Sequence, residues 1–124
     1  MKAEARERAW GDIDEEVLRS SLRELDRRLK AKFGERYLKL ILFGSRARGD
    51  HQPDSDADVA IVMRDPIEDW WPLTQSVGEE TYEILLDTGL YIEPHVIESA
   101  AINAPERSKN PPLIREILRD GYTP

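Results

Sequence analysis

The sequence predicts an α+β domain, a mixed α/β fold in which a small mixed sheet is flanked by helices. Three features lead to this class. Two short apolar runs, residues 40–43 and 59–63, have the length of buried strands and no helical periodicity. Segments with apolar residues at every third or fourth position precede and follow them. The chain has 124 residues, which suits a single domain with one hydrophobic core.

The first predicted element is an amphipathic helix over residues 12–33. Its leucines at positions 18, 22, 25 and 29 follow the spacing of one helical face. Asp12 is placed to cap the first turn, and Glu15 three residues later completes a capping-box pattern. Gly34 follows as the residue at which the helix is expected to end.

Two strands are predicted next, over residues 37–43 and 57–63. The residues between them, 44–56, are rich in glycine, serine and aspartate and show no periodicity, so they are expected to form a loop. Because the predicted connection contains no long helix, the two strands can pair antiparallel.

A second helix and a third strand follow. The helix is predicted to begin near Pro66 or near Pro72, because proline is tolerated in a first helical turn, and to end at about Thr88. The third strand covers residues 90–97. With a helix between them, the second and third strands can run parallel in the same sheet. Pro94 lies inside this strand and favours an edge position or a bulge.

The last part of the chain is predicted to be mostly loop over residues 99–112, which contain three prolines. Residues 112–119 then predict a short final helix, and Gly121 is expected to close it. The predicted order is therefore helix, strand, strand, helix, strand, helix.

The loop after the first strand carries groups that bind anions. Gly44 and Ser45 turn the chain at a point where backbone N–H groups can converge on an oxyanion, and glycine lets a phosphate approach closely. The Ser45 hydroxyl is a further donor. Arg46 and Arg48 add two guanidinium groups, which suit phosphate oxygens. A Gly-Ser pair after a strand is commonly only a turn, but here it lies beside two cations.

Two carboxylates follow this loop. Asp56 and Asp58 are separated by one residue, and residues two apart in a strand point to the same face, with Cα atoms about 6.6 Å apart. Carboxylates that close repel each other unless a cation lies between them, and Mg²⁺ prefers such oxygen ligands. An aspartate-rich turn can also be merely solvated. An anion-binding turn beside a Mg²⁺ site, however, is what a nucleoside triphosphate requires.

The composition restricts the classes of function. The chain has 18 Lys plus Arg against 25 Asp plus Glu, and its formal charge of −7 argues against an extended nucleic-acid interface. It has no cysteine, which excludes thiol nucleophiles, disulfides and thiolate metal sites and fits a cytoplasmic location. No apolar run is long enough to span a bilayer, so no membrane partner is expected.

The segments Gly-Ser-Arg-Ala-Arg-Gly at 44–49 and Ser-Asp-Ala-Asp-Val at 55–59 closely resemble the minimal nucleotidyltransferases of the DNA polymerase beta-like superfamily. That family has a Gly-Ser pair after one strand and an Asp-x-Asp pair at the start of the next. The resemblance implies a single nucleotidyltransferase domain over residues 1–124, with residues 1–11 as a disordered tail and residues 98–124 as a loop and a short C-terminal helix.

The resemblance also implies a mechanism. The Gly44-Ser45 turn, helped by the two arginines of the loop, would bind the β- and γ-phosphates of an NTP, with ATP favoured. Asp56 and Asp58 would bind two Mg²⁺ ions that orient an acceptor hydroxyl and stabilise the leaving pyrophosphate. The result would be transfer of NMP to a hydroxyl group.

Glu93 is the candidate for the third catalytic and metal-binding carboxylate that the family carries on a later strand. The family residue is usually aspartate, and the adjacent Pro94 is a further departure. Glu93 could instead face solvent from an edge strand. His95, two residues later, would share the face of Glu93 and either support the site or be a bystander.

Small stand-alone members of this family are often antitoxins paired with an all-helical toxin, which some of them modify by adding AMP. This chain is similar to them because it is short, acidic and without a visible acceptor-holding domain. The leading hypothesis is a Mg²⁺-dependent nucleotidyltransferase acting on such a partner protein. The alternative is a non-catalytic nucleotide-binding module that neutralises a helical partner by contact. A third reading is a transferase that acts on a small hydroxylated molecule.

Overall fold

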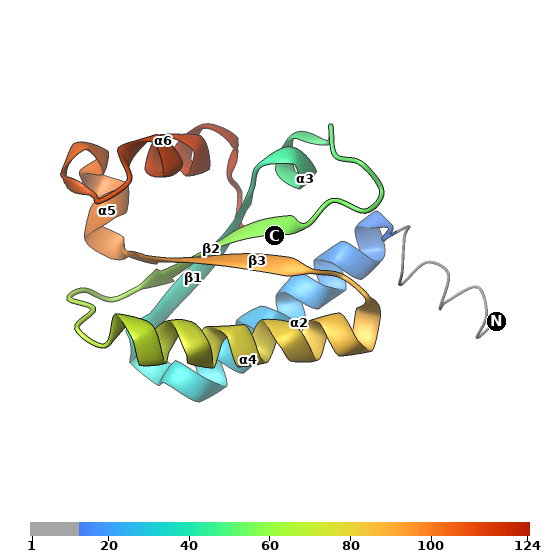
Figure 1. The fold of residues 1–124 in the computed structure, drawn as a ribbon, viewed down its shortest axis with the longest axis horizontal. Helices are drawn as coiled ribbons and strands as arrows, with labels where there is room; N and C mark the ends of the chain where they lie inside the picture. The colour runs from blue at the N-terminus through green and yellow to red at the C-terminus, as the bar shows by residue number, and fades with distance from the viewer. Residues whose placement is uncertain (1–12) are drawn as a thin grey trace.

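A computed structural model describes residues 13–124 and arranges them in three layers, with the sheet between two groups of helices (Figure 1). The predicted α+β class is therefore confirmed. Residues 1–12, which include Asp12 and the predicted tail, lie outside the described residues. The elements in chain order are α2 (Glu15–Phe33), η1 (Gly34–Arg36), β1 (Tyr37–Phe43), α3 (Ser45–Arg48), β2 (Ala57–Met63), α4 (Trp70–Thr88), β3 (Ile92–Glu98), α5 (Ser99–Asn103), η2 (Pro105–Arg107) and α6 (Pro111–Asp120).

The sheet has the order β1-β2-β3, and both predicted pairings are confirmed. β1 and β2 pair antiparallel, and β2 and β3 pair parallel across the α4 connection. The bounds of β1 and β2 are those predicted from the apolar pattern. β3 is an edge strand, as Pro94 predicts, because a residue without an N–H is tolerated where that N–H would point away from the neighbouring strand.

Two helical predictions need correction. The first helix does not begin at residue 12: α2 begins at Glu15, and Asp14 is its N-cap, since its side chain accepts a hydrogen bond of 2.8 Å from the N–H of Val17. Residues 99–112 are not mostly loop, because α5 forms over Ser99–Asn103, η2 follows over Pro105–Arg107 and α6 begins at Pro111. The two alanines of α5 favour a helix, and the first proline of the segment comes only at position 105.

The other helix predictions hold. α4 begins at Trp70, between the two prolines that marked its start, and ends at Thr88. α6 covers the predicted final helix, with Asn110 as its N-cap. Among the helices of the described part of the chain, none has the length and apolar character needed to cross a lipid bilayer.

The two faces of the sheet are covered differently. One face packs against α2 and α4 and forms the larger core, which includes Leu22, Leu29, Val59, Ile61, Val77 and Ile84. The other face packs against α5 and α6 and forms a smaller cluster of Ile41, Phe43, Ala60, Val62, Ile97, Ile114 and Ile117. Figure 1 shows α5 and α6 over only one end of this second face. The opposite end, where β2 and β3 begin, is next to α3.

We expect Gly121→Ala to destabilise the protein. Gly121 follows α6, and a Cβ there would lie 2.3 Å from the carbonyl oxygen of Ile117 and 2.5 Å from the Cγ2 of Ile41. Overpacking of this kind costs about 1–3 kcal/mol, which thermal unfolding would show as a Tm lowered by several degrees. Gly78→Ala, inside α4, is the control: nothing lies within 4 Å of the added Cβ, so its stability should be unchanged or higher. Equal melting temperatures for the two variants would contradict this packing.

Candidate active site

The uncovered end of the second sheet face carries polar side chains. Asp58 on β2 and Glu93 on β3 are Cα partners in the parallel register. Because side chains alternate along a strand, these two residues share their face with the apolar residues that α6 covers further along. Glu93 is exposed and Asp58 is half-buried. The strands thus bring two carboxylates together at the sheet end that α6 leaves open.

His95 completes a three-residue cluster with these acids. The nearest ligand atoms of Asp58, Glu93 and His95 all lie within 4.8 Å of one another. His95 Nε2 is 3.2 Å from Asp58 Oδ1, and the His95 ring packs edge-on against Phe43 with centroids 5.2 Å apart. The prediction left His95 as either a supporting residue or a bystander, and the structure joins it to Asp58. The sequence feature that indicated His95 as part of the site was its spacing of two residues from Glu93 on the same strand.

The Gly44 turn lies directly against Asp58. Gly44 has φ +74°, a conformation that L side chains rarely adopt, and a Cβ at this position would lie 2.8 Å from Asp58 Oδ2. Ser45 follows as the first residue of α3, a short helix of four residues. Glycine at position 44 is therefore required both by the backbone conformation and by the nearness of the carboxylate.

Arg46 binds the loop that leads to β2 through hydrogen bonds to backbone carbonyls. Its side chain is 3% exposed, and its guanidinium donates hydrogen bonds to the carbonyls of Ser55, at 2.9 Å, and Pro53, at 3.2 Å. Burial lowers the pKa of Arg46. These contacts hold the loop against α3. A direct contact between Arg46 and nucleotide stays a prediction.

Arg48 joins α3 to the C-terminal helix. Its guanidinium donates to Asp50, at 3.1 Å, and to Asp120 on α6, at 3.0 Å. The hydrogen bond to Asp50, followed by the one to Asp120, raises the pKa of Arg48, and Arg119 together with Arg48 lowers the pKa of Asp120 to about 2. The predicted role of Arg48 in nucleotide binding is likewise untested.

Asp56 lies one residue before β2 and is exposed. The spacing of Asp56 and Asp58 predicts side chains on one strand face, but Asp56 is outside the strand, so strand alternation does not fix its side chain on the face of Asp58. Within residues 13–124, Asp58, Glu93 and His95 are the only three acidic or histidine residues whose ligand atoms lie within 4.8 Å of one another. Asp56 does not belong to this group. Its assignment as a metal ligand stays a prediction.

The family model described as "Nucleotidyltransferase domain" matches residues 22–121, which include the Gly44 turn, the acidic cluster and most of the helices. The chain belongs to the nucleotidyltransferase domain family. This nucleotidyltransferase is 31% identical over 110 residues to "Putative protein adenylyltransferase MJ1305" of Methanocaldococcus jannaschii, covering 89% of this chain and 72% of that protein. It is 29% identical over 106 residues to "Putative protein adenylyltransferase MJ0604" of the same organism, covering 82% and 91%.

Two solved structures share the fold of this nucleotidyltransferase. One is a crystal structure of a toxin-antitoxin with AMP-PNP, with a TM-score of 0.52 and 15% identity over 84% of this chain and 69% of that chain. The other is a mutant of the toxin-antitoxin MntA-HpeT, with a TM-score of 0.51 and 15% identity over 91% and 72%. At these identities the likeness establishes the fold.

The family relationship implies a divalent metal ion, and the donor set of the nucleotidyltransferase fits one. Asp58 and Glu93 offer carboxylate oxygens, which hard divalent ions prefer, and these oxygens lie within 4.8 Å of each other. Gly44 keeps the space next to Asp58 Oδ2 free of a side chain. The described residues therefore fit a divalent cation at the start of β2 and β3.

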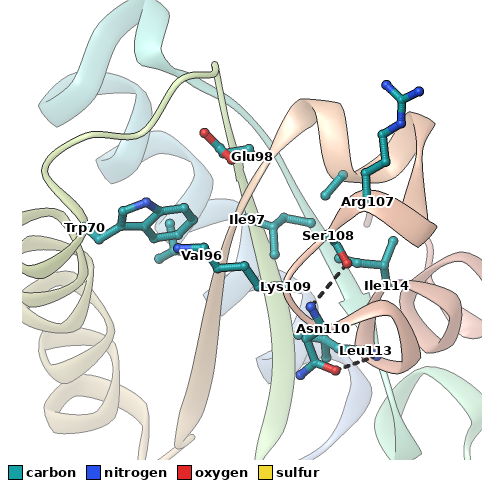
Figure 2. A pocket seen from close by; sticks show the side chains of 11 residues that line it. Trp70, Val96, Ile97, Glu98, Arg107, Ser108, Lys109, Asn110, Leu113 and Ile114 are labelled. Carbon is teal, nitrogen blue, oxygen red and sulfur yellow. Dashed lines mark hydrogen bonds between the residues drawn. The ribbon is translucent and has the colours of Figure 1, made fainter.

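A cavity of about 320 Å³ lies at the other end of β3 (Figure 2). Trp70 and Lys109 face it, and the Lys109 Nζ lies 5.3 Å from the centroid of the Trp70 ring. Its walls come from β3, α5, the segment that leads into α6 and α6 itself. Glu93 and Glu98 are five residues apart on β3, a span of about 16 Å in an extended strand. Trp70, which faces the cavity, is therefore remote from the acidic cluster. The neighbouring Trp71 side chain is 70% exposed to solvent.

Proposed function

We propose that this nucleotidyltransferase moves NMP from an NTP, with ATP favoured, to a hydroxyl group of a partner protein in a Mg²⁺-dependent reaction. The observation that carries the proposal is the meeting of Asp58, Glu93 and the Gly44 turn at one sheet end. The two relatives named as protein adenylyltransferases support ATP and a protein acceptor. NTPs are cytoplasmic metabolites, so the proposed reaction is a cytoplasmic one.

In this mechanism the backbone at Gly44 and the hydroxyl of Ser45 hold the β- and γ-phosphates. Asp58 and Glu93, with Asp56 from the preceding loop, hold two Mg²⁺ ions, which supply Lewis-acid stabilisation of the phosphate charge when bound. Glu93 takes part in removing the proton of the acceptor hydroxyl. The acceptor oxygen forms a bond to the α-phosphorus, the bond from that phosphorus to the bridging oxygen breaks, and pyrophosphate leaves.

An exposed apolar stripe on α4 supports a protein partner. Trp71, Tyr82 and Leu86 are 70%, 57% and 61% exposed, and their spacing of 11 and 4 residues puts them on one side of the helix. Large apolar side chains exposed on one side of a helix favour a protein partner. Glu83 and Asp87, both exposed, lie on the flank of the stripe. We propose that the partner is helical, with an apolar face and basic residues beside it, as the antitoxin hypothesis requires.

The test is label transfer. We expect the purified chain, mixed with its co-purified partner and Mg²⁺, to move label from [α-³²P]ATP to the partner, because AMP retains the α-phosphorus. With [γ-³²P]ATP the partner should stay unlabelled, since that phosphorus leaves in pyrophosphate. Label from the γ position would show phosphoryl transfer instead. If no NTP labels a partner that nevertheless binds, the protein is the non-catalytic module of the alternative hypothesis.

A further inference from the structure

The acidic cluster contains a nitrogen donor in addition to its carboxylates. We infer that His95 is a direct ligand of the divalent ion held by Asp58 and Glu93, and that it gives this site a preference for Mn²⁺ over Mg²⁺. This inference rests on the cation site of the proposed function. It adds an assignment for His95 and a chemical consequence for the choice of ion.

The geometry of the cluster carries the inference. His95 Nε2 and Asp58 Oδ1 are 3.2 Å apart, and all three residues offer a ligand atom within 4.8 Å of the others. An ion that holds its ligands at about 2.1 Å separates neighbouring ligands by about 3 Å and opposite ligands by about 4.2 Å in octahedral geometry. The spacing of the His95 and Asp58 atoms is therefore close to that of two neighbouring ligands on one ion.

The position of the His95 ring also fits this role. The ring packs edge-on against Phe43, which is buried at the end of β1, so the imidazole has an apolar support on one side. His95 is half-buried. Its Nε2 atom points to Asp58, the residue against which the Gly44 turn is packed. The nitrogen and the nearest carboxylate are thus held together before any ion binds.

An imidazole ligand changes which ion the site favours. Mg²⁺ binds oxygen ligands and is reluctant to exchange its water for other donors, whereas imidazole nitrogen suits transition-metal ions. Mn²⁺ accepts carboxylate oxygens as well. We therefore expect the wild-type protein to bind Mn²⁺ at least about tenfold more tightly than Mg²⁺, and we expect this ratio to fall in His95→Gln.

Pulsed electron paramagnetic resonance of bound Mn²⁺ tests the assignment directly, without nucleotide or acceptor. Directly coordinated imidazole nitrogen gives a ¹⁴N modulation of the Mn²⁺ signal, which we expect in the wild-type protein. The chain has two histidines, so His51→Gln is the matched control and should keep the modulation. His95→Gln should still bind Mn²⁺ through the carboxylates, lose the modulation, and keep the melting temperature of the folded chain.

Each other result has a defined meaning. If Mn²⁺ binds to the wild-type protein without ¹⁴N modulation, or if His95→Gln keeps it, His95 only positions Asp58 and the inference is overturned, while the proposed function is unaffected. If Mn²⁺ does not bind and the signal stays that of the free ion, with or without added NTP, the cation site itself is contradicted, and the proposed function fails with it.

Discussion

Asp58→Asn should lower the rate of nucleotidyl transfer by about 10³- to 10⁴-fold. Asp58 lies against the Gly44 turn, is 3.2 Å from His95 Nε2 and pairs with Glu93 across the two strands. Asparagine keeps the size of the side chain but removes the negative charge that holds the cation. A metal ion contributes several kcal/mol to the stabilisation of transition-state charge, and each 1.36 kcal/mol corresponds to about a tenfold change in rate. The measurement is label transfer from [α-³²P]ATP at saturating Mg²⁺.

Asp54→Asn is the matched control for this variant. Asp54→Asn makes the same change of charge in the loop that precedes β2, and Asp54 is exposed, so the transfer rate of this variant should remain that of the wild-type protein. Thermal unfolding separates catalysis from folding: Asp58→Asn should melt at the wild-type temperature or above, because it removes the repulsion between two nearby carboxylates. A rate within tenfold of wild type would rule out Asp58 as the central metal ligand.

The fold was predictable from the sequence where local patterns decide it. The apolar runs at residues 40–43 and 59–63 predicted β1 and β2 with their bounds, because a strand covered on both faces favours continuous apolar residues. The connection without a long helix predicted the antiparallel pairing of β1 and β2, and the helix between β2 and β3 predicted their parallel pairing. The predicted cap of α2 was wrong by two residues: Asp12 and Asp14 are both of a residue type that caps helices, and the capping-box spacing from Asp12 to Glu15 favoured Asp12, whereas the observed cap is Asp14.

The candidate site was only partly predictable. The sequence placed Asp58 and Glu93 on neighbouring strands, but their approach depends on the β2–β3 register, which no local pattern contains. The same register brings His95 next to Asp58. Conversely, the two arginines of the loop could be recognised as cations, whereas their bonds to backbone carbonyls and to α6 depend on how the loop folds back. Residue type and spacing can predict which residues belong to a site, but the contacts that these residues make are determined by the tertiary structure.

Gly44→Ala should lower the transfer rate by about 10²-fold. The added Cβ would lie 2.8 Å from Asp58 Oδ2, closer than two such atoms approach, so the carboxylate has to move. A misplacement of about 1 Å at a catalytic group can cost about 10²-fold in rate. The same methyl group would occupy the surface where the turn is expected to receive the phosphates. Gly44→Val, with a larger and β-branched side chain, should lower the rate further.

Gly49→Ala separates this close approach from backbone strain. Gly49 has φ +84°, similar to the +74° of Gly44, but nothing lies within 4 Å of a Cβ at position 49. Gly49 has ψ 7° and is left-handed α, where an L residue costs about 1–2 kcal/mol, whereas Gly44 has ψ −155°, a combination that is essentially restricted to glycine. Both variants should therefore melt at a lower temperature, Gly44→Ala at least as low as Gly49→Ala. Only Gly44→Ala should lose transfer and weaken Mn²⁺ binding, because only its Cβ meets Asp58. Equal losses of transfer in the two variants would instead assign the effect to a strained loop and remove the Gly44–Asp58 contact from the mechanism.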